Sequence, residues 1–331
     1  MTTISIGLLI ALFAVLAAEF VNGWTDAPNA IATVVSTGVL TPRQAVIMAV
    51  VMNTIGALCG TAVATTVAKG IVQPSALTTA SITATMVSII VWGTMAARFG
   101  IPVSKSHALL AGLAGAAFAG GGWDALLWVG WEKVGLGMVL SLAFGFCGAF
   151  ALGRIITTVA ANAKPTRAKQ RFDRLQMMSA AFLAFNHGLN DGQKFMGVFA
   201  LTLFTAGAVA EFHIAWWMMV VCALTMGLGT SFGGWRIIRT VGSKMTRLTT
   251  WQGFAATLSA SSTIFAASQY GIPLSTTHTI TSSVVGVGAS KRVSDVRWNV
   301  LGRIALAWVA TFPACALIAY IAGLIANRFW A

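Results

Sequence analysis

Charged residues are scarce in this sequence, and acidic ones are the scarcest. Only 9% of the 331 residues are charged and only eight are Asp or Glu, whereas 57% are hydrophobic. Typical soluble domains carry about 25% charged residues, so this composition excludes the common classes of soluble enzyme and binding module. Apolar runs of membrane-spanning length recur along the chain, and they predict an all-α polytopic membrane protein.

The sequence also lacks the signatures of common catalytic and redox-metal sites. It has no Gly-x-Ser-x-Gly elbow, no His-Glu-x-x-His motif and no phosphate-binding loop. A membrane hydrolase that used Ser275, His278 and Asp191 is therefore a weak alternative, and we expect neither an enzyme nor a cofactor. A channel or a sensor without transport activity is a further alternative. The four cysteines have no paired spacing and read as small buried apolar residues: Cys59, Cys147, Cys222 and Cys315.

Basic residues gather in short loops between the apolar runs. The formal net charge of +13 would indicate nucleic acid binding in a soluble protein, but in loops between spans it sets orientation, so no nucleic acid partner is expected. The longest basic stretch predicts a cytoplasmic linker at residues 154–177 between two membrane units at 1–153 and 178–331. This linker is either a flexible connector or a docking surface for a cytoplasmic regulatory protein.

A polar motif occurs twice inside apolar surroundings. Gly23-Trp-Thr-Asp-Ala-Pro-Asn-Ala30 and Gly188-Leu-Asn-Asp-Gly-Gln-Lys-Phe195 align at an offset of 165 residues, which also matches Phe20 with Phe185. We infer that the chain is a duplicated unit. Each copy interrupts an apolar run, so we expect a broken or re-entrant helix at residues 22–29 and another at Asp191.

Charge in the loops predicts opposite orientations for the two units. With the linker inside, the basic loops at 236–247 and 291–303 also fall inside, and both termini fall outside a cell inner (plasma) membrane. The result is two inverted-topology repeats with about ten crossings, an arrangement typical of secondary transporters. The segments around Pro102 and Pro273 fit either full crossings or re-entrant hairpins. A homodimer is compatible with this organisation.

The duplicated acidic motif predicts a cation site. A carboxylate inside a membrane needs a compensating partner, and Asp26 and Asp191 occupy matching positions. Together with Asn29 and Asn190 they offer the hard oxygen ligands that Na⁺ takes in a transporter, and a proton can replace that ion. Glu19 has no acidic counterpart; it is either an interfacial acid or a third coupling group.

A second motif predicts an oxyanion site. Ile-Pro-Val-Ser-Lys-Ser-His and Ile-Pro-Leu-Ser-Thr-Thr-His, which end at His107 and His278, each read as a helix start whose free N–H groups favour an anion. A plain helix cap is the simpler interpretation. Lys105 and Lys194 add cations, although Lys105 fits equally well as a side chain that reaches the membrane interface. The expected anion-binding residues are Ser104, Lys105, Ser106, Ser275, Thr276, Thr277, Gln193 and Lys194, with His107 and His278 in support.

These four motifs, in this order, resemble the signatures of the inorganic phosphate transporter (PiT) family, and the resemblance spans nearly the whole chain. It implies symport of inorganic phosphate with Na⁺ or H⁺. It further implies that the Asp/Asn motifs hold the cation, a metal site at Asp26, Asn29 and Asp191 if the ion is Na⁺, and that the Ser/Thr motifs hold phosphate. Length and a short linker resemble the compact bacterial branch. A permease for sulfate or another oxyanion on the same fold is the alternative.

Overall fold

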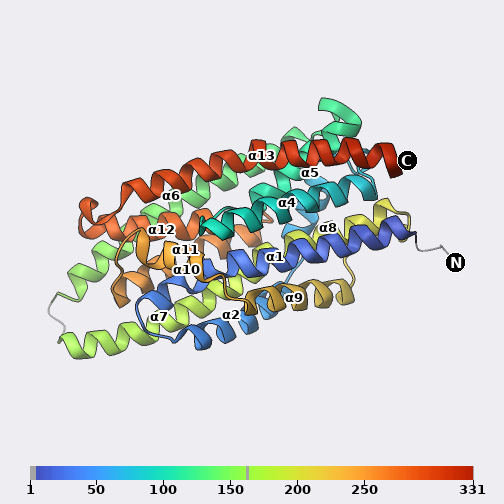
Figure 1. Cartoon of the computed structure of the whole chain (residues 1–331). Coiled ribbons are helices and arrows are strands. Elements are labelled where there is room, and N and C mark those ends of the chain that lie inside the picture. The colour runs from blue at the N-terminus through green and yellow to red at the C-terminus, as the bar shows by residue number, and fades with distance from the viewer. Residues whose placement is uncertain (1–4, 162–163, 331) are drawn as a thin grey trace.

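The computed structural model describes residues 5–161 and 164–330, and these residues form a bundle of long, roughly parallel helices (Figure 1). No strand occurs among the described residues, apart from an isolated bridge between Val72 and Leu126. The α-helices are α1 Ile6–Ser36, α2 Pro42–Ala57, α3 Ala62–Gly70, α4 Thr79–Phe99, α5 Lys105–Gly121, α6 Trp128–Val159, α7 Pro165–His187, α8 Gln193–Thr205, α9 Trp216–Ser231, α10 Trp235–Arg239, α11 Thr250–Gln269, α12 Thr276–Lys291 and α13 Trp298–Trp330.

The bundle exposes many large apolar side chains and buries a set of charged and polar ones within its apolar core, unlike a soluble protein. Large apolar side chains such as Phe13 and Leu306 are more than 70% exposed, whereas Asp26 and Asp191 are 1% exposed. Within the described residues, α1, α4, α6 and α13 are long and apolar enough to cross a membrane, and two bent helix pairs raise the number from four to six. The predicted all-α polytopic class is therefore confirmed.

The predicted ten crossings exceed these six, and the short helices explain the gap. Helices α5 and α12 have 17 and 16 residues, too few for one straight crossing of a hydrocarbon core of about 30 Å at 1.5 Å per residue. Helix α7 begins with a basic segment, and the chain from α7 to α8 carries the polar motif in its middle. The figure of ten stays a prediction.

The helix does not break at residues 22–29, so that expectation was wrong. Helix α1 runs through this stretch without interruption and contains Pro28. Proline lacks an N–H and leaves the carbonyl of Trp24 without its helical partner, and Gly234 packs against this notch. A Cβ atom on Gly234 would lie 2.3 Å from Pro28 Cγ and 2.6 Å from the Trp24 carbonyl oxygen, so this contact requires glycine.

The second acidic motif lies in a π-helical segment, η3 Gly188–Gly192, that joins α7 directly to α8. A π turn inserts extra residues without ending the helix and often marks a functional site. The sharp breaks occur instead in the next element of each half. Helices α2 and α3 bend by 71°, and α9 bends by 64° against the segment Trp235–Lys244.

Close helix crossings relate the two halves. On α1, Gly23 faces the Met226 carbonyl of α9, and in return Gly229 faces the Phe20 carbonyl; added Cβ atoms would lie 2.2 and 2.1 Å from these oxygens. The second half repeats the pattern, since added Cβ atoms on Gly188 and Gly56 would each lie 2.0 Å from a carbonyl oxygen, of Asn53 and Phe185 respectively. The acidic-motif helix of each half therefore packs against the second helix of the other half.

Most of residues 154–177, expected to be a linker, are helical. Helix α6 extends to Val159 and α7 begins at Pro165, so the connection is short, and residues 162 and 163 lie outside the described part. Proline at the first turn and a run of good helix formers explain the helix. An exposed pair, Lys169 to Asp173 at 2.8 Å, adds i,i+4 support. The start of α1 and the end of α13 lie at the opposite end of the bundle from this connection (Figure 1).

Candidate functional site

Two helix N-termini meet in the interior. Each Ile-Pro-x-Ser segment is not helical, and its serine caps the next helix: Ser104 accepts a hydrogen bond from the His107 N–H on α5, and Ser275 accepts one from the His278 N–H on α12. The two caps touch, because Ser275 Oγ donates to Ser104 Oγ at 2.9 Å. The positive ends of two helix dipoles therefore converge on one buried place.

The first carboxylate lies beside the start of α5. Asp26 Oδ1 is 3.0 Å from the ammonium nitrogen of Lys105, and Asp26 Oδ2 accepts from the Lys105 backbone N–H at 3.4 Å. The ammonium also donates to the Val103 carbonyl at 3.3 Å. Lys105 and Asp26 are each 1% exposed, so Lys105 points into the bundle and not to the membrane interface.

The second carboxylate has more partners. Asp191 Oδ1 pairs with the ammonium of Lys194 and accepts from Ser106 Oγ at 3.4 Å, and Asp191 Oδ2 accepts from Thr276 Oγ1 at 2.6 Å. The Lys194 ammonium also donates to Ser106 Oγ and to the Leu274 carbonyl, both at 2.6 Å. Residues of both hydroxyl motifs thus bond to the carboxylate or the lysine of the second acidic motif.

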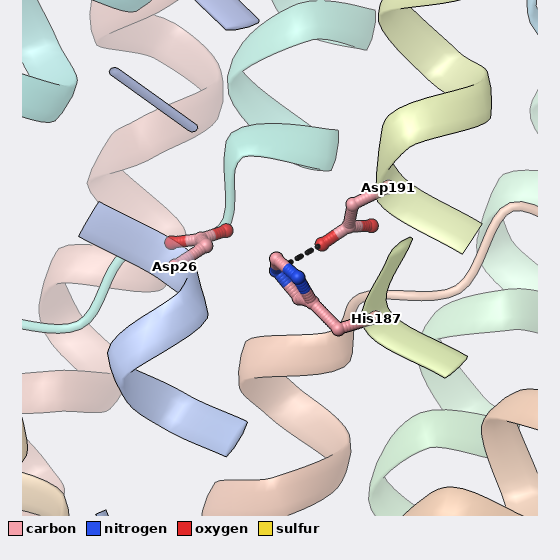
Figure 2. Close-up of side chains that lie close together, drawn as sticks. All are labelled: Asp26, His187 and Asp191. Atoms are coloured by element: carbon pink, nitrogen blue, oxygen red, sulfur yellow. Dashed lines mark ion pairs between the residues drawn. The ribbon is translucent and has the colours of Figure 1, made fainter. Parts of the chain in front are cut away.

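The two acidic motifs approach each other across the same place. Figure 2 shows Asp26 on α1 facing Asp191 and His187 at the end of α7. One ligand atom from each of these three residues lies within 4.8 Å of the other two, so the group can hold a metal ion. Asn29 completes the connection, since its Nδ2 donates to Thr277 Oγ1 at 3.0 Å, while its Oδ1 has no partner.

Some of the predicted residues point elsewhere, although every predicted site residue is at most 4% exposed. Gln193 Oε1 accepts from the Val63 N–H at 2.9 Å and so caps the start of α3 beyond the bend. Asn190 Nδ2 donates to Ser268 Oγ on α11 at 2.8 Å. Glu19 accepts from Asn22 Nδ2 at 3.0 Å, and its other oxygen has no hydrogen-bond partner.

The two predicted supporting histidines lie behind the helix caps. Their rings contact edge to face with centroids 4.5 Å apart, and His278 stacks on Trp308 at 3.7 Å. His278 Nδ1 lies 2.6 Å from Ser275 Oγ. These contacts hold the capping serine in place and keep both rings outside the carboxylate cluster.

His187 is the site residue that sequence reasoning missed. Its Nε2 lies 3.3 Å from Asp191 Oδ2, and its Nδ1 lies 3.1 Å from Oδ1 of Asn53 on α2. The contact with Asn53 orients the ring so that Nε2 faces Asp191. The spacing of four residues between His187 and Asp191 was the available signal, because it places both on one helix face.

Comparisons with known proteins match this chain to phosphate transporters. A model described as "Phosphate transporter family" matches residues 22–165 and 154–319. A probable low-affinity inorganic phosphate transporter from Rhizobium meliloti is 43% identical over 319 residues, 96% of either chain. One from Bacillus subtilis is 40% identical over 318 residues, 95% of this chain and 96% of the relative. These relatives are named as transporters and not as enzymes, as the sequence predicted.

A solved structure shows the same fold. The protein titled "The sodium-dependent phosphate transporter" superimposes with a TM-score of 0.88 over 99% of this chain and 100% of its own, at 23% identity. At 23% identity this similarity shows the fold and not the function. The family model covers most of this chain and the bacterial relatives align along almost its full length, so the chain belongs to the phosphate transporter family.

Proposed function

We propose that the chain is a secondary symporter that imports inorganic phosphate together with a cation, Na⁺ or H⁺. One observation carries this proposal: two hydroxyl-rich helix N-termini and two membrane-embedded carboxylates from different segments meet in one buried cluster. Helix N-termini and hydroxyl donors bind an oxyanion. Adjacent carboxylates bind a cation, so the two ligands can be carried together.

In this proposal the phosphate lies between the starts of α5 and α12. In this structure the Ser106 hydroxyl donates to Asp191 Oδ1 or to the Leu274 carbonyl, and the Thr276 hydroxyl donates to Asp191 Oδ2. When phosphate enters, both hydroxyls turn to its oxygens. Backbone N–H groups at both helix starts add donors. Asp26 and Asp191 then bind the cation whose positive charge accompanies the anion through a low-dielectric interior. Gln193 and Asn190 do not contact the phosphate in this proposal. Gln193 stabilises the bend between α2 and α3, and Asn190 binds α11.

The reciprocal glycine contacts support two repeats of opposite orientation, with residues 1–153 and 178–331 as the units. Gly23 and Gly188 are 165 residues apart, and their partners Met226 and Asn53 are related by a second constant offset that also relates Gly229 to Gly56. Such pairing is expected of a pseudo-twofold axis in the membrane plane, about which one unit rocks against the other. Both termini then lie outside a plasma membrane. A homodimer and a regulatory protein at residues 154–177 stay predictions.

Uptake of labelled phosphate into proteoliposomes tests the proposal. Imposed inward Na⁺ or H⁺ gradients should drive saturable accumulation above the external concentration, and unlabelled phosphate should compete better than sulfate. Equilibration without accumulation would indicate a channel. Stronger competition by sulfate would favour the alternative oxyanion permease.

A further inference from the structure

We propose that Lys105 and Lys194 are resident cations that occupy the two positions where a co-transported metal ion would bind, so that phosphate transport by this chain does not require Na⁺. The inference rests on the proposed function, because it specifies the coupling ion of that same site. It makes the two lysines determinants of ion specificity and not phosphate ligands.

Each half of the chain builds the same pair of oxygens. Asp26 and Asp191 are 165 residues apart in the duplicated acidic motif, and Val103 and Leu274 are 171 residues apart in the duplicated hydroxyl motif. One lysine ammonium lies against Asp26 Oδ1 and the Val103 carbonyl, and the other lies against Asp191 Oδ1 and the Leu274 carbonyl. Carboxylate and free carbonyl oxygens at a helix start are the ligands that Na⁺ takes in unwound transporter helices.

The two lysines themselves are not equivalent. The position that matches Lys105 in the second hydroxyl motif is Thr276, and the position that matches Lys194 in the first acidic motif is Asn29. One ammonium therefore comes from the hydroxyl motif of the first half and the other from the acidic motif of the second half. The oxygen pairs match between the two halves, but the lysines that contact them come from sequence positions that do not match. The two halves therefore share a cation bound at these oxygens, and not a lysine inherited from the duplicated unit.

The surrounding helices are shaped around the lysine side chain in the first half. A Cβ atom on Gly93 of α4 would lie 2.8 Å from Lys105 Cε and 3.5 Å from Lys105 Cδ, so a side chain there would displace the lysine. Both lysines are 1% exposed. Each ammonium is a buried positive charge held by a carboxylate and a carbonyl of its own half, and the Lys194 ammonium also donates to Ser106 Oγ of the first half.

A metal cation at either position would meet this fixed charge at contact distance in a low-dielectric interior, where repulsion is strong. The remaining candidate ligands, Asp26, His187 and Asp191, include an imidazole nitrogen. Imidazole suits zinc, copper, iron and nickel, whereas Na⁺ binds hard oxygen ligands. Among the described His, Cys, Asp and Glu side chains, the group that could hold a metal ion at these carboxylates therefore includes a nitrogen ligand, which Na⁺ does not favour.

Two measurements on the wild-type protein decide the proposal without any variant. Phosphate uptake into proteoliposomes should change by less than about twofold when NaCl is replaced by choline chloride at constant ionic strength and pH, and NaCl should not raise the melting temperature of the detergent-purified protein above its value in choline chloride. Uptake that falls about tenfold or more without Na⁺, or a melting temperature that rises with Na⁺, overturns the proposal. The melting measurement needs no transport, so it decides even if the phosphate symport proposal fails.

Lys105→Met and Lys194→Met sharpen the test, because methionine keeps most of the side-chain length and removes the charge. Each variant should lose uptake in choline chloride and regain it at least about tenfold in NaCl, since Na⁺ now fills the emptied position. Lys169→Met, which removes an exposed lysine of an ion pair, should behave as wild type in both salts. Folded Lys105→Met and Lys194→Met proteins that are equally active in both salts would also overturn the proposal.

Discussion

The two halves of this chain neutralise matching carboxylates in different ways. Asp26 has one side-chain partner, the ammonium of Lys105, and a long contact to the Lys105 N–H. Asp191 has an ammonium, two hydroxyls and a nearby imidazole. The two halves therefore place a carboxylate at the same position but surround it with different residues.

Removing either carboxylate should have the largest effect on phosphate uptake and on stability. Asp191→Asn and Asp26→Asn each leave a buried ammonium without its counterion, and breaking such a pair destabilises a protein by about 3–5 kcal/mol. We expect phosphate uptake to fall at least about tenfold in both variants, and Asp191→Asn to melt at the lower temperature because Asp191 has more partners.

The double variant Asp26→Asn/Lys105→Met is the control for unpaired charge. It removes both members of the ion pair and should melt above Asp26→Asn alone. Full phosphate uptake by either single Asn variant would remove that carboxylate from the site. Equal melting temperatures for the two single variants would show that the extra contacts of Asp191 contribute no stability.

Close helix packing offers a test of whether the two halves are equivalent as scaffolds. Gly23→Ala and Gly188→Ala each place a methyl group about 2 Å from a carbonyl oxygen of the facing helix, and overpacking of this kind costs about 1–3 kcal/mol. We expect similar drops in melting temperature. Gly302→Ala on α13 has nothing within 4 Å of its new methyl group and should be neutral or stabilising. A large effect at one of the two paired positions only would argue against a pseudo-twofold arrangement.

Loss of one hydroxyl should have a smaller and more selective effect. Thr276→Val removes the donor to Asp191 but keeps the shape of the side chain. A buried anion that loses a donor loses about 1–2 kcal/mol, so the apparent affinity for phosphate should weaken about tenfold. Thr279→Val is the matched control one turn further along α12, because its hydroxyl bonds to the Ser275 carbonyl of its own helix. Equal phosphate affinities in the two variants would exclude Thr276 from the anion site.

Breaking an exposed ion pair should have the smallest effect, and it serves as a reference for the loss of the buried ion pairs. Asp173→Asn breaks the contact with Lys169 on the exposed part of α7, and surface pairs contribute about 0–1 kcal/mol. Melting temperature and phosphate uptake should both stay close to wild type. A loss comparable to that of Asp26→Asn would mean that the start of α7 takes part in transport and is not only a connection.

Composition and duplicated motifs predicted the helical membrane fold, and they pointed to most of the residues that we propose for the site. In the structure the hydroxyl and acidic motifs meet, with Thr276 on Asp191 and Asn29 on Thr277. A pattern of residues along one chain cannot show that Pro28 is tolerated inside α1. That tolerance depends on Gly234, more than 200 positions away in the sequence, which packs against the proline.

The contacts of individual side chains could not be predicted from the sequence either. Lys105 and Lys194 were expected to bind the anion, but each pairs with a carboxylate of its own half. Gln193 was expected in the same site, but the bend between α2 and α3 brings the Val63 N–H within its reach. Such choices depend on the direction in which a side chain leaves its helix and on which neighbour leaves room, as Gly93 does for Lys105.

Locating phosphate in the protein is the most direct test of the central claim. A cryo-electron microscopy structure determined with and without inorganic phosphate should show the added density between the starts of α5 and α12, within hydrogen-bond distance of Ser106 and Thr276. Density bound only elsewhere, for example in the apolar pocket that His107, His278 and Trp308 share with α6 and α13, would contradict the account.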